Sequence, residues 1–527
     1  MADVGFRSPG TCASALAWLG AACVGVACAA DAPPPYAEAL FVVDTDLPVP
    51  QIAARLRVDL YAANGTWYES RDIARNDAAS WPASFSVFSP EPARTTRVIV
   101  RIRTYPEGIE RDYRGERFAD EHGAPADGAR ATEEDPRLLR GDVDVTPPRE
   151  PQPTAAVDRL VLVKLYPGKR GRVRVTLRGA CAGTMARLSM TAPYQTPTFT
   201  EAQTCTTDPG KRVPLAEEVL DDDMSIPPAT ALGAFSRRAD CDPAAPADPR
   251  AVCIPGGAFV LGSQTASGVG TEFDASPERV AVIDRFWLDR HEVTVAQLRS
   301  ALASGLDHAD GWPQKNAVIA HEGVLGATDA ADAFPFDRWC TYSAQPRGHE
   351  DFPVNCMSWK GARAYCKLLG GDLPSEAQWE YAAVAAGRPF EVDFPWGNDA
   401  PTCERAVYAR VPIGNGINDC STFPAGPVRA DEALGDVTPL GLIGMAGNVS
   451  ELVLDSYARF TDPCWLGASQ LNPVCTSSTR PSHGLRGGSF LVQSYFANAA
   501  LRNDDSSPSF RALFGFRCAF TAPPGKP

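Results

Sequence analysis

The stretch DFPVNCMSWKGARAYCKLLGGDLPSEAQWEYAA, residues 351–383, contains the two segments of the C-terminal half that predict helices. GARAYCKLLGG predicts the first helix and PSEAQWEYAAVAA the second, and Ser375 directly before Glu376 is typical of a helix start. Glu376 and Glu380 lie one helical turn apart, so both carboxylates can face one side, as a structural or as a catalytic pair. From Ala251 onward, tryptophan and glycine are frequent and short motifs alternate with irregular segments. This pattern indicates a loop-rich C-terminal domain.

The N-terminal half has a different sequence pattern, which predicts strands. RLRVDLY and RVIVRIR alternate aliphatic with charged residues, the pattern of half-buried strands. ALFVVDTDL, SFSVFS, DRLVLVKLY and GRVRVTLRGACAG are further strand candidates. We expect a small β-sandwich over residues 36–205, with a polar, Pro/Gly-rich insertion at about 106–156 that is too poor in apolar residues to order itself. Residues 206–250 are expected to be a linker.

The first residues predict a signal peptide, residues 1–29. Arg7 precedes the small-residue apolar run Ala13–Ala30, and Ala27-Cys28-Ala29 fits a cleavage site. The run is marginal for a membrane span, which needs about 18 or more apolar residues. We therefore expect an exported protein, periplasmic or secreted, and the alternative is a lipoprotein in which Cys28 carries the lipid and brings the chain to a membrane.

The cysteines agree with export. Fifteen are present, and an even twelve remain after Cys12, Cys23 and Cys28 are set aside. An even count in an exported chain favours disulfides, and the mature part contains no C-x-x-C that would indicate a zinc site. Proximity in the sequence suggests five pairs and leaves two cysteines over, Cys366 and Cys518; the five are Cys181–Cys205, Cys241–Cys253, Cys340–Cys356, Cys403–Cys420 and Cys464–Cys475.

Composition and charge limit the classes of partner. The chain is 44% hydrophobic and 22% charged, as soluble globular proteins are. Its formal net charge is −14, and no basic stripe is visible in the sequence, so nucleic acid is not an expected partner.

Seven short blocks in the C-terminal half together carry a family resemblance. In order they are CIPGGAFVLGS (253–263), SPERVAVIDRFWLDRHEVTVAQL (276–298), the stretch 351–383, FPWGN (394–398), GLIGMAGNVSEL (441–452), LRGGSF (485–490) and FGFRCA (514–519). Over about residues 251–521 the chain resembles the formylglycine-generating enzyme family, also called sulfatase-modifying factor domains. The resemblance implies an α+β fold related to C-type lectins, with little regular secondary structure, in which Glu376 and Glu380 are structural.

The resemblance also implies a disulfide and a calcium site. The family joins its "AYC" helix to its terminal "GFRC", which here are Cys366 and Cys518; closing roughly 150 residues would contribute about 4–5 kcal/mol in the chain-entropy model. The family's calcium ligands correspond to the carboxylate of Glu451 and the carbonyls of Gly447 and Val449. Because Gly444 stands where the family has Asp or Asn, we expect calcium to bind weakly here.

The family's reaction oxidises a cysteine of a partner protein, typically a sulfatase, to formylglycine, using oxygen and copper(I) held by two cysteines just after "GGS". The corresponding loop here contains Arg486, Gly487, Gly488, Ser489 and Val492. Val492 stands at the position of the first cysteine, and no cysteine occurs from Thr476 to Arg517. Copper(I) selects thiolates, so copper is not an expected cofactor and the loop has no expected catalytic residue.

Two functions remain open, together with a weaker third. The first is an exported, non-catalytic binding or structural member, a pseudoenzyme that keeps the family's groove for an extended peptide or protein partner. The alternative is an oxidoreductase that converts a protein cysteine to formylglycine, for sulfatase maturation, with a differently built metal site. The third is carbohydrate binding through the lectin-like geometry. The six histidines show no close-spaced metal motif; they are His122, His291, His308, His321, His349 and His483.

Overall fold

The computed structural model divides the chain into two units after Phe235. It describes residues 36–523 apart from gaps, the longest of which are 107–138, 145–154, 187–201 and 307–338. The expected signal peptide and most of the expected insertion lie outside the described residues. No helix of the described part is long and apolar enough to span a membrane.

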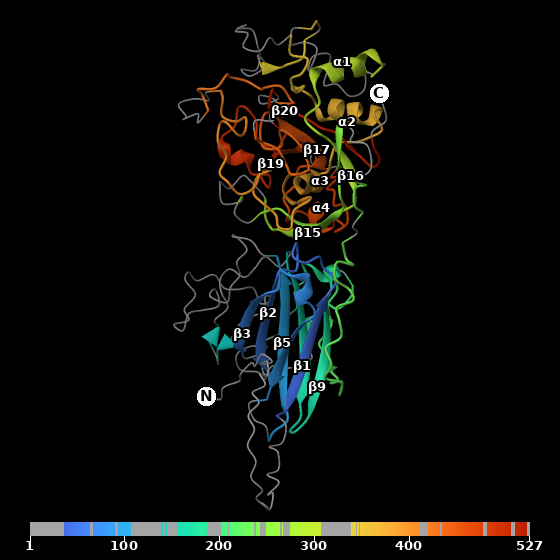
Figure 1. The fold of residues 1–527 in the computed structure, drawn as a ribbon, viewed down its shortest axis with the longest axis vertical. Helices are drawn as coiled ribbons and strands as arrows, with labels where there is room; N and C mark the ends of the chain where they lie inside the picture. The colour runs from blue at the N-terminus through green and yellow to red at the C-terminus, as the bar shows by residue number, and fades with distance from the viewer. Residues whose placement is uncertain are drawn as a thin grey trace, which may run out of the picture. The chain divides into compact units, whose positions relative to one another are not determined.

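Unit 1 is built from β-strands (Figure 1). A five-stranded sheet has the order β12-β8-β5-β2-β3, and a three-stranded sheet has the order β4-β1-β9. Small two-stranded sheets are formed by β6 with β7 and by β10 with β11. The strands are β1 (Glu38–Thr45), β2 (Arg55–Ala62), β3 (Trp67–Ala74), β4 (Ala83–Phe88), β5 (Thr96–Tyr105), β6 (Leu139–Arg140), β7 (Val143–Asp144), β8 (Val157–Leu165), β9 (Arg170–Leu177), β10 (Gln203–Thr204), β11 (Val213–Pro214) and β12 (Glu217–Glu218).

Each of the six segments that predicted strands contains one, but the expectation that β2 and β5 are half-buried is wrong. The charged residues inside these strands are as buried as the aliphatic ones, and Arg57, Asp59 and Arg101 are each 0% exposed; Arg55 and Arg97, near the strand ends, are not buried. Pairing explains this burial: Arg57 Nε lies 2.9 Å from Asp59, and Arg101 Nε lies 2.8 Å from Asp158 on β8. Buried charges are tolerated when they are paired in this way, so charge alternation does not by itself indicate a solvent face.

Residues 206–235, which we expected to be linker, group with unit 1. β12 pairs in parallel with β8, so this segment contributes the edge strand of the five-stranded sheet. The Cys181–Cys205 disulfide joins the segment after β9 to the residue after β10.

Unit 2 contains short strands, four helices and much loop in its described part (Figure 1). Its sheets have the orders β13-β16-β21, β14-β15 and β19-β18-β17-β20. The strands are β13 (Ala251–Ile254), β14 (Gly257–Leu261), β15 (Arg279–Ile283), β16 (Phe286–Asp289), β17 (Ser450–Ser456), β18 (His483–Arg486), β19 (Arg502–Asp504), β20 (Phe514–Gly515) and β21 (Ala519–Phe520).

The four helices of the described part of unit 2 include two that the sequence analysis missed. The two expected helices are α2 (Trp359–Leu368) and α3 (Glu376–Glu380), and α3 continues as a π-helical turn over Tyr381–Ala385. Ser375 caps α3 as expected, by accepting a hydrogen bond from the Gln378 amide. The additional helices are α1 (Val295–Ala303) and α4 (Pro463–Leu466).

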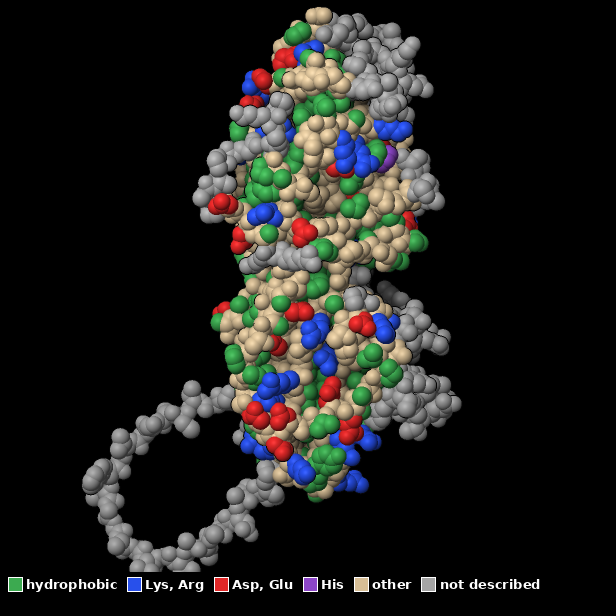
Figure 2. Space-filling model, turned by 90° about the vertical axis from the view of Figure 1, so that its right-hand side faces the viewer, with side chains coloured by type: hydrophobic (Ala, Val, Ile, Leu, Met, Phe, Trp, Pro, Cys, Tyr) green, Lys and Arg blue, Asp and Glu red, His purple; other side chains and the backbone are tan. Residues whose placement is uncertain are grey.

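Two apolar clusters and five disulfides lie within unit 2, and a sixth disulfide lies within unit 1. One cluster surrounds Cys366, Phe490 and Phe516, and the other surrounds Trp379, Trp465 and Val453. The six disulfides are the same pairs that proximity and the family resemblance suggested: Cys181–Cys205, Cys241–Cys253, Cys340–Cys356, Cys366–Cys518, Cys403–Cys420 and Cys464–Cys475. On the face shown in Figure 2, acidic and basic side chains of the described residues are interspersed in both units.

Candidate functional site

The loop that follows β18 passes through two glycines before it reaches the site. Gly487 has φ +74°, and a side chain there would collide with the Met445 carbonyl and approach the Trp379 ring. Gly488 donates its amide to the Ala446 carbonyl at 3.1 Å, and a Cβ there would lie 2.7 Å from that oxygen. Only glycine allows this close approach of two backbones. The GG pair therefore holds the loop against residues 445–446.

A buried ion-pair network fixes the start of this loop to α3. Arg486 donates to Glu376 at 3.0 Å and to Glu380 at 2.7 Å, and Arg502 on β19 donates to Glu376 at 2.6 and 2.9 Å. All four side chains are buried. Burial alone would raise the pKa of Glu376, but Arg502 and Arg486 hold that pKa below its usual value. The two glutamates face one side of α3 and serve as anchors for arginines, as their structural interpretation predicted.

Beyond the glycines the loop is a tight turn packed on the core. Ser489 is 0% exposed, its hydroxyl accepts the Leu491 amide at 3.3 Å, and its carbonyl accepts the Val492 amide at 3.2 Å. Phe490 is also buried, and it donates its amide to the Asn448 carbonyl at 2.9 Å. Val492, at the family's first cysteine position, packs against the apolar cluster around Phe490. The turn presents a hydroxyl and aliphatic groups, with no thiol.

The cysteines of the described residues, and one of the histidines, are engaged in other contacts. All twelve cysteines that the structure describes form disulfides. Within the same described part, no three His, Cys, Asp or Glu side chains are grouped as metal ligands. His483 stacks on Trp359 with ring centroids 4.0 Å apart, and its Nδ1 lies 3.1 Å from Asp505. His122, His308 and His321 lie outside the described residues.

The expected calcium ligands lie at the start of β17, but the carboxylate among them, Glu451, already accepts hydrogen bonds from other side chains. Glu451 accepts bonds from Arg517 Nε at 2.7 Å, from Arg517 Nη2 at 2.6 Å and from Trp379 Nε1 at 2.8 Å. Calcium needs six or more oxygen ligands with free lone pairs. Gly447 and Val449 can offer only backbone carbonyls, so this set of residues does not fit a calcium ion in the arrangement that the structure shows.

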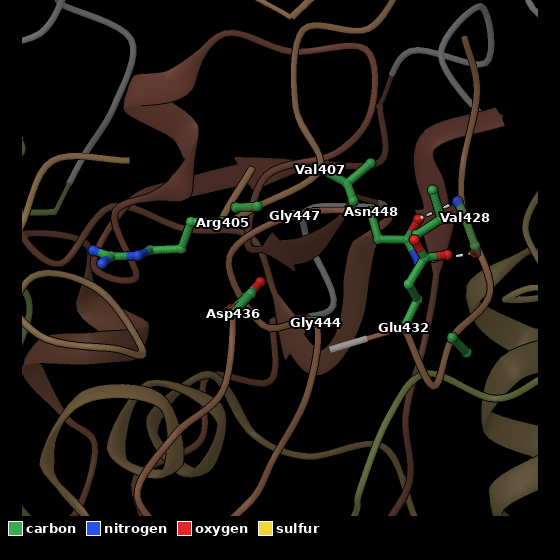
Figure 3. Close-up of a pocket in the computed structure, with 10 residues that line it drawn as sticks. Arg405, Val407, Val428, Glu432, Asp436, Gly444, Gly447 and Asn448 are labelled. Carbon is green, nitrogen blue, oxygen red and sulfur yellow. Dashed lines mark hydrogen bonds between the residues drawn. The ribbon is translucent and has the colours of Figure 1, made fainter. Parts of the chain in front are cut away.

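A small pocket lies beside the same segment, lined by Asp436, Gly444, Gly447 and Asn448 among others (Figure 3). Asn448 closes one side by exchanging two hydrogen bonds with the Val428 backbone, at 2.9 and 3.4 Å. Asp436 is buried; its Oδ2 accepts the Ala446 amide at 2.7 Å, whereas its Oδ1 has no hydrogen-bond partner. Burial raises the pKa of Asp436 to about 7.

Glu292, just before α1, lies behind Gly444. A Cβ on Gly444 would be 3.0 Å from Glu292 Oε2, so any side chain at this position would meet a carboxylate. Glu292 is 0% exposed and neither of its carboxylate oxygens has a hydrogen-bond partner. Burial raises the pKa of Glu292 well above its usual value. The sequence analysis identified Gly444 but missed Asp436, which precedes it closely, and Glu292 and Arg517, which are far from it in the chain.

Comparison with known proteins identifies the family. Residues 238–522, more than half of the chain, match the sulfatase-modifying factor enzyme 1-like domain. The chain belongs to this family, which is also that of the formylglycine-generating enzymes.

The relatives include catalysts and a protein named as inactive. The chain is 28% identical over 288 residues to the formylglycine-generating enzyme of Thermomonospora curvata, with 51% of this chain and 92% of the relative covered. It is 27% identical over 299 residues to the inactive C-alpha-formylglycine-generating enzyme 2 of Bos taurus, with 52% of this chain and 90% of the relative covered. The solved structure of PvdO from Pseudomonas aeruginosa aligns with a TM-score of 0.36 at 20% identity, over 52% of this chain and 94% of that one.

Proposed function

We propose that this protein is an exported, non-catalytic member of the formylglycine-generating enzyme family that binds an extended peptide or protein segment. The observation that carries the proposal is the loop Arg486–Val492: its scaffold is intact, and an aliphatic side chain stands where the family has its first copper-binding cysteine. Copper(I) coordination requires soft ligands, which valine and phenylalanine do not supply. The likeness to a mammalian relative named as inactive supports the same conclusion.

The proposed partner lies along the loop, because the family groove is lined by this segment. The buried Ser489 and Phe490 and the ion pairs of Arg486 keep the backbone rigid, which lowers the entropy lost on binding. Carbohydrate binding through a lectin-like fold is the alternative kind of recognition, and a glycan array tests it. We further propose that the two larger sheets of unit 1 pack as a β-sandwich that serves binding or spacing.

Export is supported by the disulfides. Six are present in the described residues, and disulfides persist mainly in oxidising compartments. We propose removal of residues 1–29 and release to the periplasm or the exterior. The lipoprotein alternative predicts a lipid-modified Cys28, which mass spectrometry of the mature N-terminus detects.

The test is oxygen consumption and formylglycine formation by the purified, oxidised chain, with the metal content measured on the same sample. The substrate is a cysteine-containing sulfatase peptide, supplied with and without copper(I), and an active formylglycine-generating enzyme is the positive control. We expect neither oxygen uptake nor aldehyde product. Product formation with stoichiometric copper or iron would establish instead the oxidoreductase with a differently built metal site.

A further inference from the structure

Arg410 lies directly beside the candidate loop. Its amide donates to the Phe490 carbonyl at 2.7 Å, and the preceding Ala409 amide donates to the Val492 carbonyl at 2.8 Å. Three residues earlier in the chain, Val407 accepts the Asn448 amide at 2.8 Å. The backbone of residues 407–410 is therefore fixed along the loop, next to the position of the family's first cysteine.

The side chain of Arg410 is buried without an acceptor. It is 4% exposed, its Nε is enclosed with no hydrogen-bond partner, and the described residues give its guanidinium neither a hydrogen bond nor an ion pair. Its ring contact is with Phe423, 5.4 Å away. Burial lowers the pKa of Arg410, and Glu432 opposes this only from beyond ion-pair distance. Enclosing a guanidinium donor without an acceptor is unfavourable, and Nε of Arg410 is such a donor.

Other buried arginines of unit 2 form ion pairs with carboxylates. Arg486, Arg502 and Arg517 are each at most 1% exposed, and each donates to a buried glutamate at 3.0 Å or less. Among the described residues, unit 2 therefore supplies carboxylates to those arginines, but not to Arg410. A carboxylate from a bound ligand would give Arg410 the kind of partner that the other buried arginines have.

We propose that Arg410 binds a carboxylate of the peptide that lies along the loop Arg486–Val492, so that the site selects acidic peptides. This inference rests on the proposed peptide-binding function. A guanidinium presents parallel donors that match the two oxygens of a carboxylate, and such charge-assisted pairs are strong and directional.

The experiment selects peptides from a random displayed library on the intact, oxidised chain. It then compares one selected peptide with its copy in which Asp or Glu is replaced by Asn or Gln. We expect acidic residues to be enriched and the acidic peptide to bind at least about tenfold more tightly than its amide copy. In Arg410→Gln this preference should fall to about twofold or less, whereas Arg405→Gln, which removes an arginine paired with Asp399 at the surface, should keep it.

Stability separates a binding arginine from a structural one. Because Arg410 has no hydrogen-bond or ion-pair partner among the described residues, Arg410→Met should leave the melting temperature unchanged or raise it. Three results would each overturn the inference while leaving peptide binding itself intact. They are a fall of several degrees in the melting temperature of Arg410→Met, selected peptides without acidic enrichment, and an unchanged acid preference in Arg410→Gln. Failure to select any peptide would overturn the proposed function and this inference with it.

Discussion

Arg517 and Glu451 form a buried two-point ion pair, with Nε 2.7 Å from Oε2 and Nη2 2.6 Å from Oε1. The pair joins the terminal GFRC segment to β17, and Arg517 also donates to the Ile443 carbonyl at 2.8 Å. It thus connects the C-terminal strands to the segment that lines the pocket of Figure 3.

Removing Arg517 should destabilise the protein strongly. Arg517→Gln leaves Glu451 buried without its cation, and breaking a buried pair in this way costs about 3–5 kcal/mol. Urea unfolding followed by tryptophan fluorescence measures the loss. Arg429→Gln, which breaks the exposed pair with Asp351, is the control and should leave the midpoint unchanged. Equal midpoints for the two variants would contradict the structural importance of the pair.

Calcium should not stabilise this protein. Glu451 already accepts three hydrogen bonds, and Gly444 supplies no ligand. A ligand that bound only the folded state would contribute about 2.7 kcal/mol at a hundredfold excess over its Kd. Thermal unfolding in EDTA and in millimolar calcium should therefore give the same midpoint. A rise of several degrees with calcium would show that Glu451 exchanges Arg517 for the metal.

The sequence predicts regular elements best where a local signal decides them. Ser375 before α3 and the aliphatic runs of unit 1 are such signals, and the structure has helices and strands there. α1 was missed although Thr294 and Gln297 form a capping box at its start, because its apolar spacing is short and the preceding block reads as a strand. The charged faces of β2 and β5 were misjudged because alternation reports which residues share a face, not whether that face is covered.

The candidate site was predicted less well because it is assembled across large separations. Gly444, Gly447 and Glu451 follow from one motif, but their environment depends on Glu292, some 150 residues earlier, and on Arg517, 66 residues after Glu451. Nothing local in the sequence indicates that Arg517 forms an ion pair with Glu451. The burial of Arg410 is equally invisible, because its neighbour Phe490 comes from a distant loop.

The Cys366–Cys518 disulfide should contribute more stability than the short-range bridges. It spans 152 residues, whereas Cys464–Cys475 spans 11. In the chain-entropy model the longer loop corresponds to roughly 5 kcal/mol and the shorter one to roughly 3 kcal/mol. Double alanine variants of each pair, compared by urea unfolding, measure this difference. A larger loss of stability on removing the Cys464–Cys475 pair would show that local packing, not loop closure, determines how much each disulfide stabilises the protein.

Stability should also depend on the ionisation of Asp436. Burial raises its pKa from 3.8 to about 7, so the folded protein holds this proton more tightly than the unfolded chain does. The contribution is fully present below the unfolded pKa and is lost as pH rises through about 7, by an amount on the order of 4 kcal/mol. Asp436→Asn keeps an acceptor for the Ala446 amide and cannot ionise, so it should melt higher than the native protein at pH 8 and approach it at pH 4. Asp431→Asn, a change at the surface, is the control; if both variants follow the native protein across this range, Asp436 does not ionise on its own in the folded state.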